Sequence, residues 1–388
     1  MRMADNSSRL SRRSVLRATG GAVAGLAATG FAAADPDDLV EVNVGFANRT
    51  GRAKAVDAAT EVVREFAFDA ITIRLPKKAV SGLENNPNVR YVEENGEMRA
   101  LAQTLPWGID RVDAEVAHAN GETGSGADVA IIDTGIDSDH PDLQANLGTG
   151  NAVVQCKGSP NKTCRQPWDD DNGHGTHCAG IADGIDDTEG VVGVSTQATL
   201  HAVKVLDKQG SGSFSDIAAG IQWTADQGYD VGSMSLGASS GSQTIKDACQ
   251  YADDNGVLLV AAAGNSGPCT DCVGYPAAYS TVMAVSSTAS DDSLSDFSST
   301  GPEVEIAAPG SNIYSTYYGG GYDTLSGTSM ACPHVAGGGA QLMANGYTNT
   351  EARDRLTGTA EDLGLASNEQ GSGLLDVAAA LGLDSSDD

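Results

Sequence analysis

The chain has 388 residues, enough for one large domain and a smaller one with a sizeable buried core. Its formal net charge of −29 argues against nucleic acid and anionic membrane surfaces as partners, because both are themselves negatively charged. The charge is uneven, since residues 1–101 carry 14 Lys and Arg against 13 Asp and Glu, whereas residues 102–388 carry 9 against 39. The composition therefore predicts a domain boundary near residue 101 and a soluble protein adapted to high salt, where ions screen self-repulsion.

Residues 1–34 have the features of an export signal. Arg12 and Arg13 precede a mildly apolar run rich in Gly and Ala, residues 18–34, which is too short and too weak for a membrane span. The alternative is an arginine pair that occurs by chance in a disordered tail. The pair resembles a twin-arginine (Tat) leader, although Val15 stands where those leaders usually carry Phe. We therefore expect a signal peptide and a secreted protein, exported by the twin-arginine route and without a membrane anchor.

A small α+β unit is expected at residues 35–101. Strand-like runs at 40–46, 68–75 and 89–94 enclose helix-like stretches near 52–62 and 77–85. A unit of this size is marginal for folding alone. It could serve as a binding module or as a pro-segment that docks on the domain that follows.

From residue 127 onward, strand-like and helix-like patterns alternate. Apolar strand-like runs lie at 128–133, 200–206, 231–236, 256–264 and 281–287. Between them, apolar residues recur at helical spacing, from Phe214 to Ile221 and from Ile245 to Ala252. Near-continuous apolar strands joined by helices predict an α/β domain whose parallel sheet is covered on both faces. In such a sheet the functional residues are expected at the carboxyl ends of the strands.

Short motifs at strand ends and helix starts carry reactive side chains. "DTGID" puts Asp133 directly after a buried strand, where a carboxylate needs a partner because an isolated buried charge is costly. "HGTH" puts His174 at the start of a helix. "GTSMACPH" puts Ser329 at the start of another helix, where backbone N–H groups and the helix dipole favour a developing negative charge. "AAAGNSG" ends a strand with Asn265, whose amide is able to donate into a cleft.

Each of these motifs alone has an ordinary structural explanation, such as a helix cap. Together, in the order Asp, His, Ser with an Asn between the last two, they resemble the motifs of the subtilisin-like serine peptidases (subtilases). The resemblance implies a three-layer α/β domain with a mostly parallel sheet at residues 102–388. Combined with the acidic composition, it makes the chain similar to the halolysins, the subtilases of salt-loving archaea.

The resemblance implies a catalytic role for each of the four residues. Ser329 attacks the peptide carbonyl, while His174 takes the proton and later delivers it to the leaving amine. Asp133 fixes the tautomer of His174 and stabilises the imidazolium. Asn265 holds the oxyanion together with the backbone N–H of Ser329. The implied function is a serine endopeptidase.

The resemblance also implies a cleft for an extended polypeptide, bound through its main chain. It assigns main-chain contacts to Gly210, Ser211 and Gly212 on one side and to Ser235, Leu236 and Gly237 on the other. It assigns Phe214, Ile217 and Leu236 to an apolar pocket four residues upstream of the cut, and Gly274 to the floor of a primary pocket open to large apolar side chains. The alternative is that these apolar residues belong to the core.

The segment "ADGIDDTEGVVGV" resembles a calcium-binding loop that interrupts the helix of His174. Oxygen donors from carbonyls and a few carboxyls suit Ca²⁺. The resemblance assigns ligands to Gln103, Asp142, Ile185, Asp187, Glu189 and Val191. A solvated acidic loop is the alternative. The run "WDDDNG", residues 168–173, is expected to be a solvated loop rather than a second metal site.

Seven cysteines occur in a chain whose export would let disulfides persist. Cys156 and Cys164 flank a short loop and are a plausible bridge, and Cys269 and Cys272 in "CTDC" could form a tight one. Zinc is a weaker alternative, because the two pairs lie in different loops without histidine companions. The other cysteines are expected to be buried thiols; they are Cys178, Cys249 and Cys332.

The unit at residues 35–101 resembles the subtilase propeptide, an intramolecular inhibitor removed by its own enzyme, and the resemblance implies a ferredoxin-like α+β fold for it. Cutting after Leu101 would put Leu101 in the primary pocket and Met98 in the upstream pocket. Two other classes stay open: a peptide-binding homologue without catalysis, and a thiol hydrolase that uses Cys178 or Cys332. We expect a monomer.

Overall fold

The computed structural model describes residues 39–95, 103–158 and 164–385. The chain divides into two compact units, Met1–Arg99 and Ala100–Asp388, and each is described by itself. Within the described ranges, the helices are all too short or too polar to cross a membrane.

Two sets of sequence predictions fall outside the described residues. They are the signal peptide at 1–34 and the maturation site with Met98 and Leu101. Both stay predictions.

The smaller unit is a four-stranded antiparallel sheet with two helices. In chain order its elements are β1 (Leu39–Phe46), α1 (Arg49–Ala58), β2 (Glu61–Glu65), β3 (Ala70–Pro76), α2 (Lys77–Glu84) and β4 (Val89–Glu94). The strands lie in the order β2-β3-β1-β4, which with this chain order is a ferredoxin-like arrangement. Alternate residues of β1, among them Val42 and Val44, turn inward to meet Ile71 and Ile73 of β3.

Helix α1 spans Arg49–Ala58, whereas the sequence predicted a helix near residues 52–62. Asn48 caps the helix by accepting hydrogen bonds from two backbone N–H groups, so α1 begins at Arg49. The run Glu61–Glu65 is instead a strand that pairs with β3. Its two adjacent valines favour the pleated conformation over the helix and are a local signal for this strand.

The larger unit is built on a seven-stranded parallel sheet. Its strands are β11 (Val304–Pro309), β10 (Met283–Thr288), β9 (Leu258–Ala262), β8 (Val231–Met234), β5 (Asp128–Asp133), β7 (Thr199–Lys204) and β6 (Asn151–Ala152), given in their spatial order. The five predicted strands are all present, with ends shifted by two residues or fewer. The prediction missed β6, which is too short to leave a pattern, and β11, which ends in a proline.

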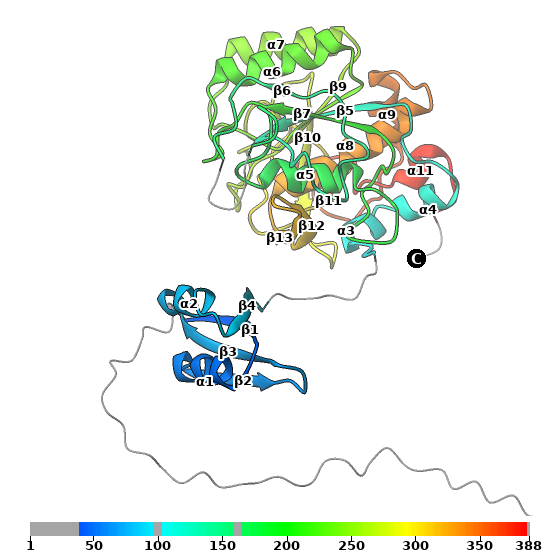
Figure 1. Cartoon of the computed structure of the whole chain (residues 1–388). Coiled ribbons are helices and arrows are strands. Elements are labelled where there is room, and N and C mark those ends of the chain that lie inside the picture. The colour runs from blue at the N-terminus through cyan, green and yellow to red at the C-terminus, as the bar shows by residue number, and fades with distance from the viewer. Residues whose placement is uncertain (1–38, 96–102, 159–163, 386–388) are drawn as a thin grey trace, which may run out of the picture. The chain divides into compact units, whose positions relative to one another are not determined.

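Helices cover both faces of this sheet and make three layers (Figure 1). Helices α6 (Phe214–Gln227) and α7 (Gln243–Asp254) pack on one face, and α5 (His174–Asp183) and α8 (Thr328–Ala344) pack on the other. Strand β5 explains why both faces need cover. Val129 and Ile131 belong to the core beneath α5 and α8, whereas Ala130 and Ile132 belong to the core beneath α6 and α7. The predicted three-layer α/β fold is confirmed.

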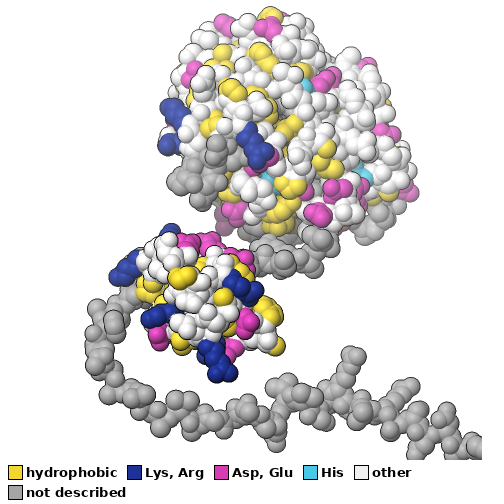
Figure 2. Space-filling view, in the orientation of Figure 1, with side chains coloured by type: hydrophobic (Ala, Val, Ile, Leu, Met, Phe, Trp, Pro, Cys, Tyr) yellow, Lys and Arg dark blue, Asp and Glu magenta, His cyan; other side chains and the backbone are white. Residues whose placement is uncertain are grey.

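The remaining elements close the larger unit. They are α3 (Trp107–Asp110), α4 (Ala114–Ala119), β12 (Ile313–Tyr317), β13 (Gly321–Leu325), α9 (Asn349–Gly358), α10 (Ser367–Gln370) and α11 (Val377–Leu381). Strands β12 and β13 form an antiparallel hairpin that packs on α5. Figure 2 shows Asp and Glu side chains spread over the visible face of this unit among few Lys and Arg side chains.

The run at residues 168–173 is not the solvated loop that was expected. Asp169, Asp170 and Asp171 are all buried. Their carboxylates accept hydrogen bonds from backbone donors of the surrounding loops and from the Thr176 hydroxyl in the helix that starts at His174, which offset the cost of burial. The prediction was wrong because an acidic composition does not reveal how many donors the fold brings to it.

Candidate active site

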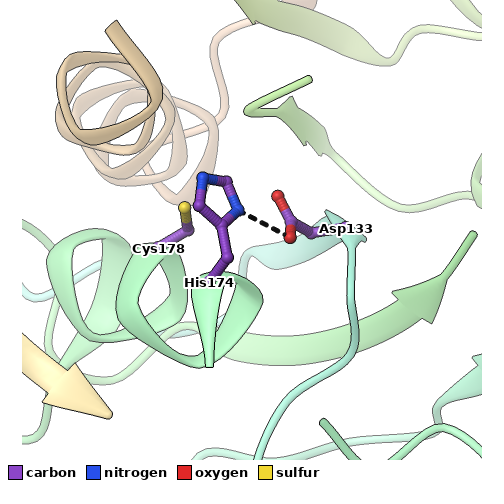
Figure 3. Close-up of side chains that lie close together, drawn as sticks. All are labelled: Asp133, His174 and Cys178. Carbon is purple, nitrogen blue, oxygen red and sulfur yellow. Dashed lines mark hydrogen bonds and ion pairs between the residues drawn. The ribbon is translucent and has the colours of Figure 1, made fainter. Parts of the chain in front are cut away.

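Asp133 and His174 meet at the carboxyl edge of the parallel sheet. Asp133 is the last residue of β5 and is fully buried, and His174 is the first residue of α5. The Nδ1 atom of His174 lies 2.8 Å from Oδ1 of Asp133, and Figure 3 shows the two side chains facing each other. Because a carboxylate only accepts hydrogen bonds, Nδ1 carries the proton and Nε2 of the neutral ring is an acceptor.

The environment of His174 tunes its protonation. Burial lowers the pKa of the imidazole, but the charge and the hydrogen bond of Asp133 outweigh burial, so the pKa lies above its ordinary value. The ring is therefore neutral, and able to accept a proton at Nε2, only above this raised pKa.

The buried carboxylate of Asp170 holds the ends of β5 and α5 together. Its Oδ1 accepts hydrogen bonds from Thr134 Oγ1 and from Gly173 N, each at 2.9 Å. Its Oδ2 accepts from the backbone N–H and the hydroxyl of Thr176. Burial raises the pKa of Asp170 despite these bonds. Sequence reasoning missed this residue, whose only signal was its place in the acidic run before His174.

A buried ion pair supports the same edge from the neighbouring strand. Lys204 ends β7 directly opposite Asp133, and its side chain is fully buried. Its Nζ lies 2.8 Å from Asp171 Oδ1 and also donates to the carbonyls of Thr134 and Leu206. A buried pair of this kind fixes geometry more than it adds stability, because desolvation offsets much of the attraction. No motif or spacing in the sequence indicates this pair.

Ser329 lies at the start of α8, partly exposed at this edge. Its hydroxyl donates to the carbonyl oxygen of Ser235 at 3.3 Å, and the hydroxyl of Ser235 donates back to the carbonyl of Ser329 at 2.7 Å. Among the described residues, no hydrogen bond joins Ser329 to His174. Such catalytic contacts are often long before substrate binds.

Asn265 is oriented by Thr328, the residue before Ser329. The Oδ1 atom of Asn265 accepts hydrogen bonds from Thr328 N at 2.9 Å and from Thr328 Oγ1 at 3.0 Å. Its carbonyl oxygen is thereby occupied, and its NH₂ group is left as a donor beside Ser329. Sequence reasoning missed Thr328, although it belongs to the "GTSM" motif.

Two adjoining cavities collect the predicted substrate-binding residues. The first, of about 490 Å³, is lined by His174 together with Gly210, Ser211, Gly212, Phe214, Ile217, Ser235, Leu236 and Gly237. The second, of about 610 Å³, is lined by Ser329, Asn265 and Gly274, and shares the segment 235–238 with the first. Phe214 is 42% exposed rather than part of the core, whereas Ile217 is buried and belongs to the core beneath α6 and α7 as well as lining the cavity. The nine residues thus lie along one cleft that contains the reactive side chains.

The three free cysteines are buried thiols, as expected. Cys178 lies one helical turn after His174 (Figure 3). Its Sγ donates to the Ser329 carbonyl at 3.5 Å. Burial raises the pKa of Cys178 well above its usual value and that of Cys332 to about 11. Because the thiolate is the nucleophilic form, both thiols are poor candidates for the attacking group.

The two expected disulfide pairs are bonded. Cys156 joins Cys164, and Cys269 joins Cys272. The second bridge lies in the wall of the larger cavity, which Cys272 lines.

Four of the predicted calcium residues converge near the loop that follows α5. The side-chain amide of Gln103 donates to the carbonyl of Ile185 at 2.7 Å and to that of Val191 at 3.4 Å. Oδ2 of Asp142 accepts from Val191 N at 2.8 Å. Asp142 is buried, and its burial raises its pKa.

The other two predicted ligands are more open. The side chains of Asp187 and Glu189 are exposed, and Asp187 accepts a hydrogen bond from Glu189 N at 2.8 Å. The donor set fits Ca²⁺. The buried carboxylate of Asp142 accepts from Val191 N, and the carbonyl oxygens of Ile185 and Val191 both accept from the single amide of Gln103. Turning the Gln103 amide over would bring its oxygen to those carbonyls, an arrangement that only a cation would stabilise.

Comparison with known proteins agrees with this geometry. The subtilase family model matches residues 124–373. The alkaline protease of Alkalihalobacillus alcalophilus is 43% identical over 323 residues, which cover 82% of this chain and 81% of that protein. Subtilisin E of Bacillus subtilis is 42% identical over 337 residues, which cover 84% of this chain and 86% of that protein. The chain therefore belongs to the subtilase family of serine endopeptidases.

Proposed function

We propose that the chain is the precursor of a secreted, salt-adapted endopeptidase of the halolysin type, which hydrolyses extracellular proteins through Asp133, His174 and Ser329. The observation that carries the proposal is the 2.8 Å contact between His174 Nδ1 and Asp133 Oδ1 at the edge where Ser329 begins α8. The acidic surface supports salt adaptation, and the leader-like residues 1–34 support export by the twin-arginine route.

The chemical steps follow from the donors and acceptors at this edge. His174 Nε2 takes the proton of the Ser329 hydroxyl as its oxygen attacks the peptide carbonyl, and then gives it to the leaving amine. Asp133 holds the Nδ1 proton and stabilises the imidazolium. Water then attacks the acyl-enzyme by the same route in reverse.

The negative charge that develops on the carbonyl oxygen needs donors already in place. Asn265 supplies its NH₂ group and Ser329 its backbone N–H, at the positive end of the α8 dipole. Thr328 acts as a positioning residue, because it holds the Asn265 amide through the carbonyl oxygen.

Substrates bind as an extended strand between the segments 210–212 and 235–237, whose backbones supply affinity without regard to sequence. The apolar walls of the two cavities give a preference for large apolar side chains before the cut. Residues 35–101 act as an inhibitory propeptide that the enzyme removes by cutting after Leu101. The mature enzyme works as a monomer.

Calcium is proposed to bind at Gln103, Asp142, Ile185, Asp187, Glu189 and Val191. The ion would stabilise the loop after α5 and takes no part in the chemical steps. The support is the fit of the donor set to Ca²⁺ and the buried carboxylate of Asp142.

The first prediction concerns the nucleophile. The full chain and its Ser329→Ala variant are refolded in high salt with calcium, then tested for self-cleavage near Leu101 and for casein hydrolysis. The parent should mature and digest casein, whereas the variant should stay full length and lose about 10⁶ in turnover. Ser326→Ala, which changes an exposed serine three residues earlier, should behave as the parent. Maturation of the Ser329→Ala variant would refute the assignment.

The second prediction concerns the oxyanion donor. Thr328→Val should lower kcat about tenfold with KM nearly unchanged, because Asn265 loses one of its two restraints. Asn265→Ala should cost about 10²–10³ in kcat, the loss known for subtilisin. The double variant should lose no more than Asn265→Ala alone. If the fold losses in kcat of the two single variants multiply in the double variant, Thr328 does not act through Asn265.

The third prediction concerns calcium. In the Ser329→Ala background, which prevents self-digestion, chelation by EGTA should lower the thermal unfolding midpoint by about 5–10 °C, as expected for a site held near a hundred times its Kd. Asp142→Asn should abolish most of this shift, whereas Asp186→Asn, in the same loop but without an assigned ligand role, should retain it. An equal EGTA shift in Asp142→Asn would place the ion elsewhere.

A further inference from the structure

The cavity that holds Ser329 and Asn265 has a charged wall that the apolar preference does not explain. Asp271 and Glu303 are the only charged side chains among the described residues that line it, and both are acidic. No described Lys or Arg lines the same cavity. A substrate side chain that enters it therefore meets a negative potential.

Glu303 carries a carboxylate oxygen that is shielded from water and has no hydrogen-bond partner. Its Oε2 is buried and unpartnered among the described residues. A Cβ built on Gly301 would lie 2.8 Å from this oxygen and 3.0 Å from Val273 Cγ2, which locates the oxygen beside another residue of the cavity wall. By contrast, Glu305 pairs with Arg353.

A shielded carboxylate oxygen without a donor lowers the stability of the fold, because it has lost its hydrogen bonds to water and forms none within the protein. The cost is removed when a cationic donor arrives in the cavity. Apolar residues of the same wall, among them Leu236, Val273 and Ala278, suit the aliphatic stem of a long side chain. Lysine and arginine combine such a stem with a cation at its end.

A bound metal ion is a poorer match for this carboxylate. In the part of the chain that the structure describes, neither Glu303 nor Asp271 belongs to a group of three close metal-ligating side chains. Asp271 is exposed, so water and salt screen its charge. A substrate cation should therefore interact more strongly with Glu303 than with Asp271.

We propose that Glu303 is a specificity-determining residue, which lets the primary pocket accept lysine and arginine before the cut as well as large apolar side chains. This inference rests on the proposed endopeptidase function and refines it. The ion pair would form at an oxygen that is shielded from water, so salt should screen it much less than it screens a pair on the surface.

The test uses the mature enzyme and four peptide p-nitroanilides that differ only in the residue before the cut: Lys, Arg, Phe and acetyl-lysine. Acetyl-lysine keeps the stem of lysine but not its charge. Active enzyme is counted by titration with a serine-directed reagent, so misfolded protein does not enter the rates. The parent should cleave the Lys and Arg peptides about 10- to 100-fold better than the acetyl-lysine peptide, measured as kcat/KM.

Glu303→Gln, which keeps the shape and removes the charge, should erase this advantage and leave kcat/KM for Phe within about twofold of the parent. Asp271→Asn is the matched control in the same wall and should retain most of the advantage. Should the Glu303→Gln protein fail to mature, the inhibition constant of benzamidine against the Phe peptide in the parent and in Asp271→Asn tests the same charge, because inhibition that comes from Glu303 should be kept when Asp271 loses its charge.

Two outcomes would overturn the inference: an unchanged ratio of Lys to Phe cleavage in Glu303→Gln, or a parent that cleaves Phe but no better after Lys than after acetyl-lysine. Benzamidine inhibition that is lost in Asp271→Asn counts against it as well. Each leaves the proposed function intact. A titrated parent that cleaves none of the four peptides would instead overturn the proposed function.

Discussion

The buried carboxylate of Asp133 is the constraint on which the site depends. A charge at the end of a central parallel strand is tolerated only where the fold supplies donors. The imidazole of His174 and the backbone N–H of Thr134 supply them, both to Oδ1. The same contact that compensates the buried charge also fixes the tautomer of His174 and raises its pKa. Stability at this edge and reactivity therefore come from one interaction.

That interaction is held by polar groups that take no part in the chemistry. Asp170 ties the end of β5 to the first turn of α5, and Lys204 ties β7 to the same point. The hairpin β12–β13 also packs against α5. There the carbonyl oxygens of Ile313 and Asp323 each lie 3.1 Å from His177 Nε2. Burial lowers the pKa of His177 to about 4, so it stays neutral and structural. The helix that carries His174 is thus fixed on both flanks.

The parts that sequence could predict are those with a local signal. Apolar runs with helices between them predicted the central strands, and the motifs around Asp133, His174 and Ser329 predicted the reactive residues. The support for those residues was not predictable, because Asp170 and Lys204 look like any surface charge until the fold buries them. The same holds for Glu303, whose place in the cavity wall depends on segments far from it in the sequence, such as 235–238. Strand β2 is different, because its two adjacent valines are a local signal for a strand.

The most direct test of the account is to find which atom reacts, and at which pH. A fluorophosphonate reagent is allowed to react with the mature enzyme across a range of pH, and the modified peptide is identified by mass spectrometry. The account predicts modification of Ser329 alone, with a rate that rises with pH through the raised pKa of His174. In Asp133→Asn this rise should move to lower pH, because the charge that raises the pKa is gone. Modification of Cys178, or a rate independent of pH, would contradict the account.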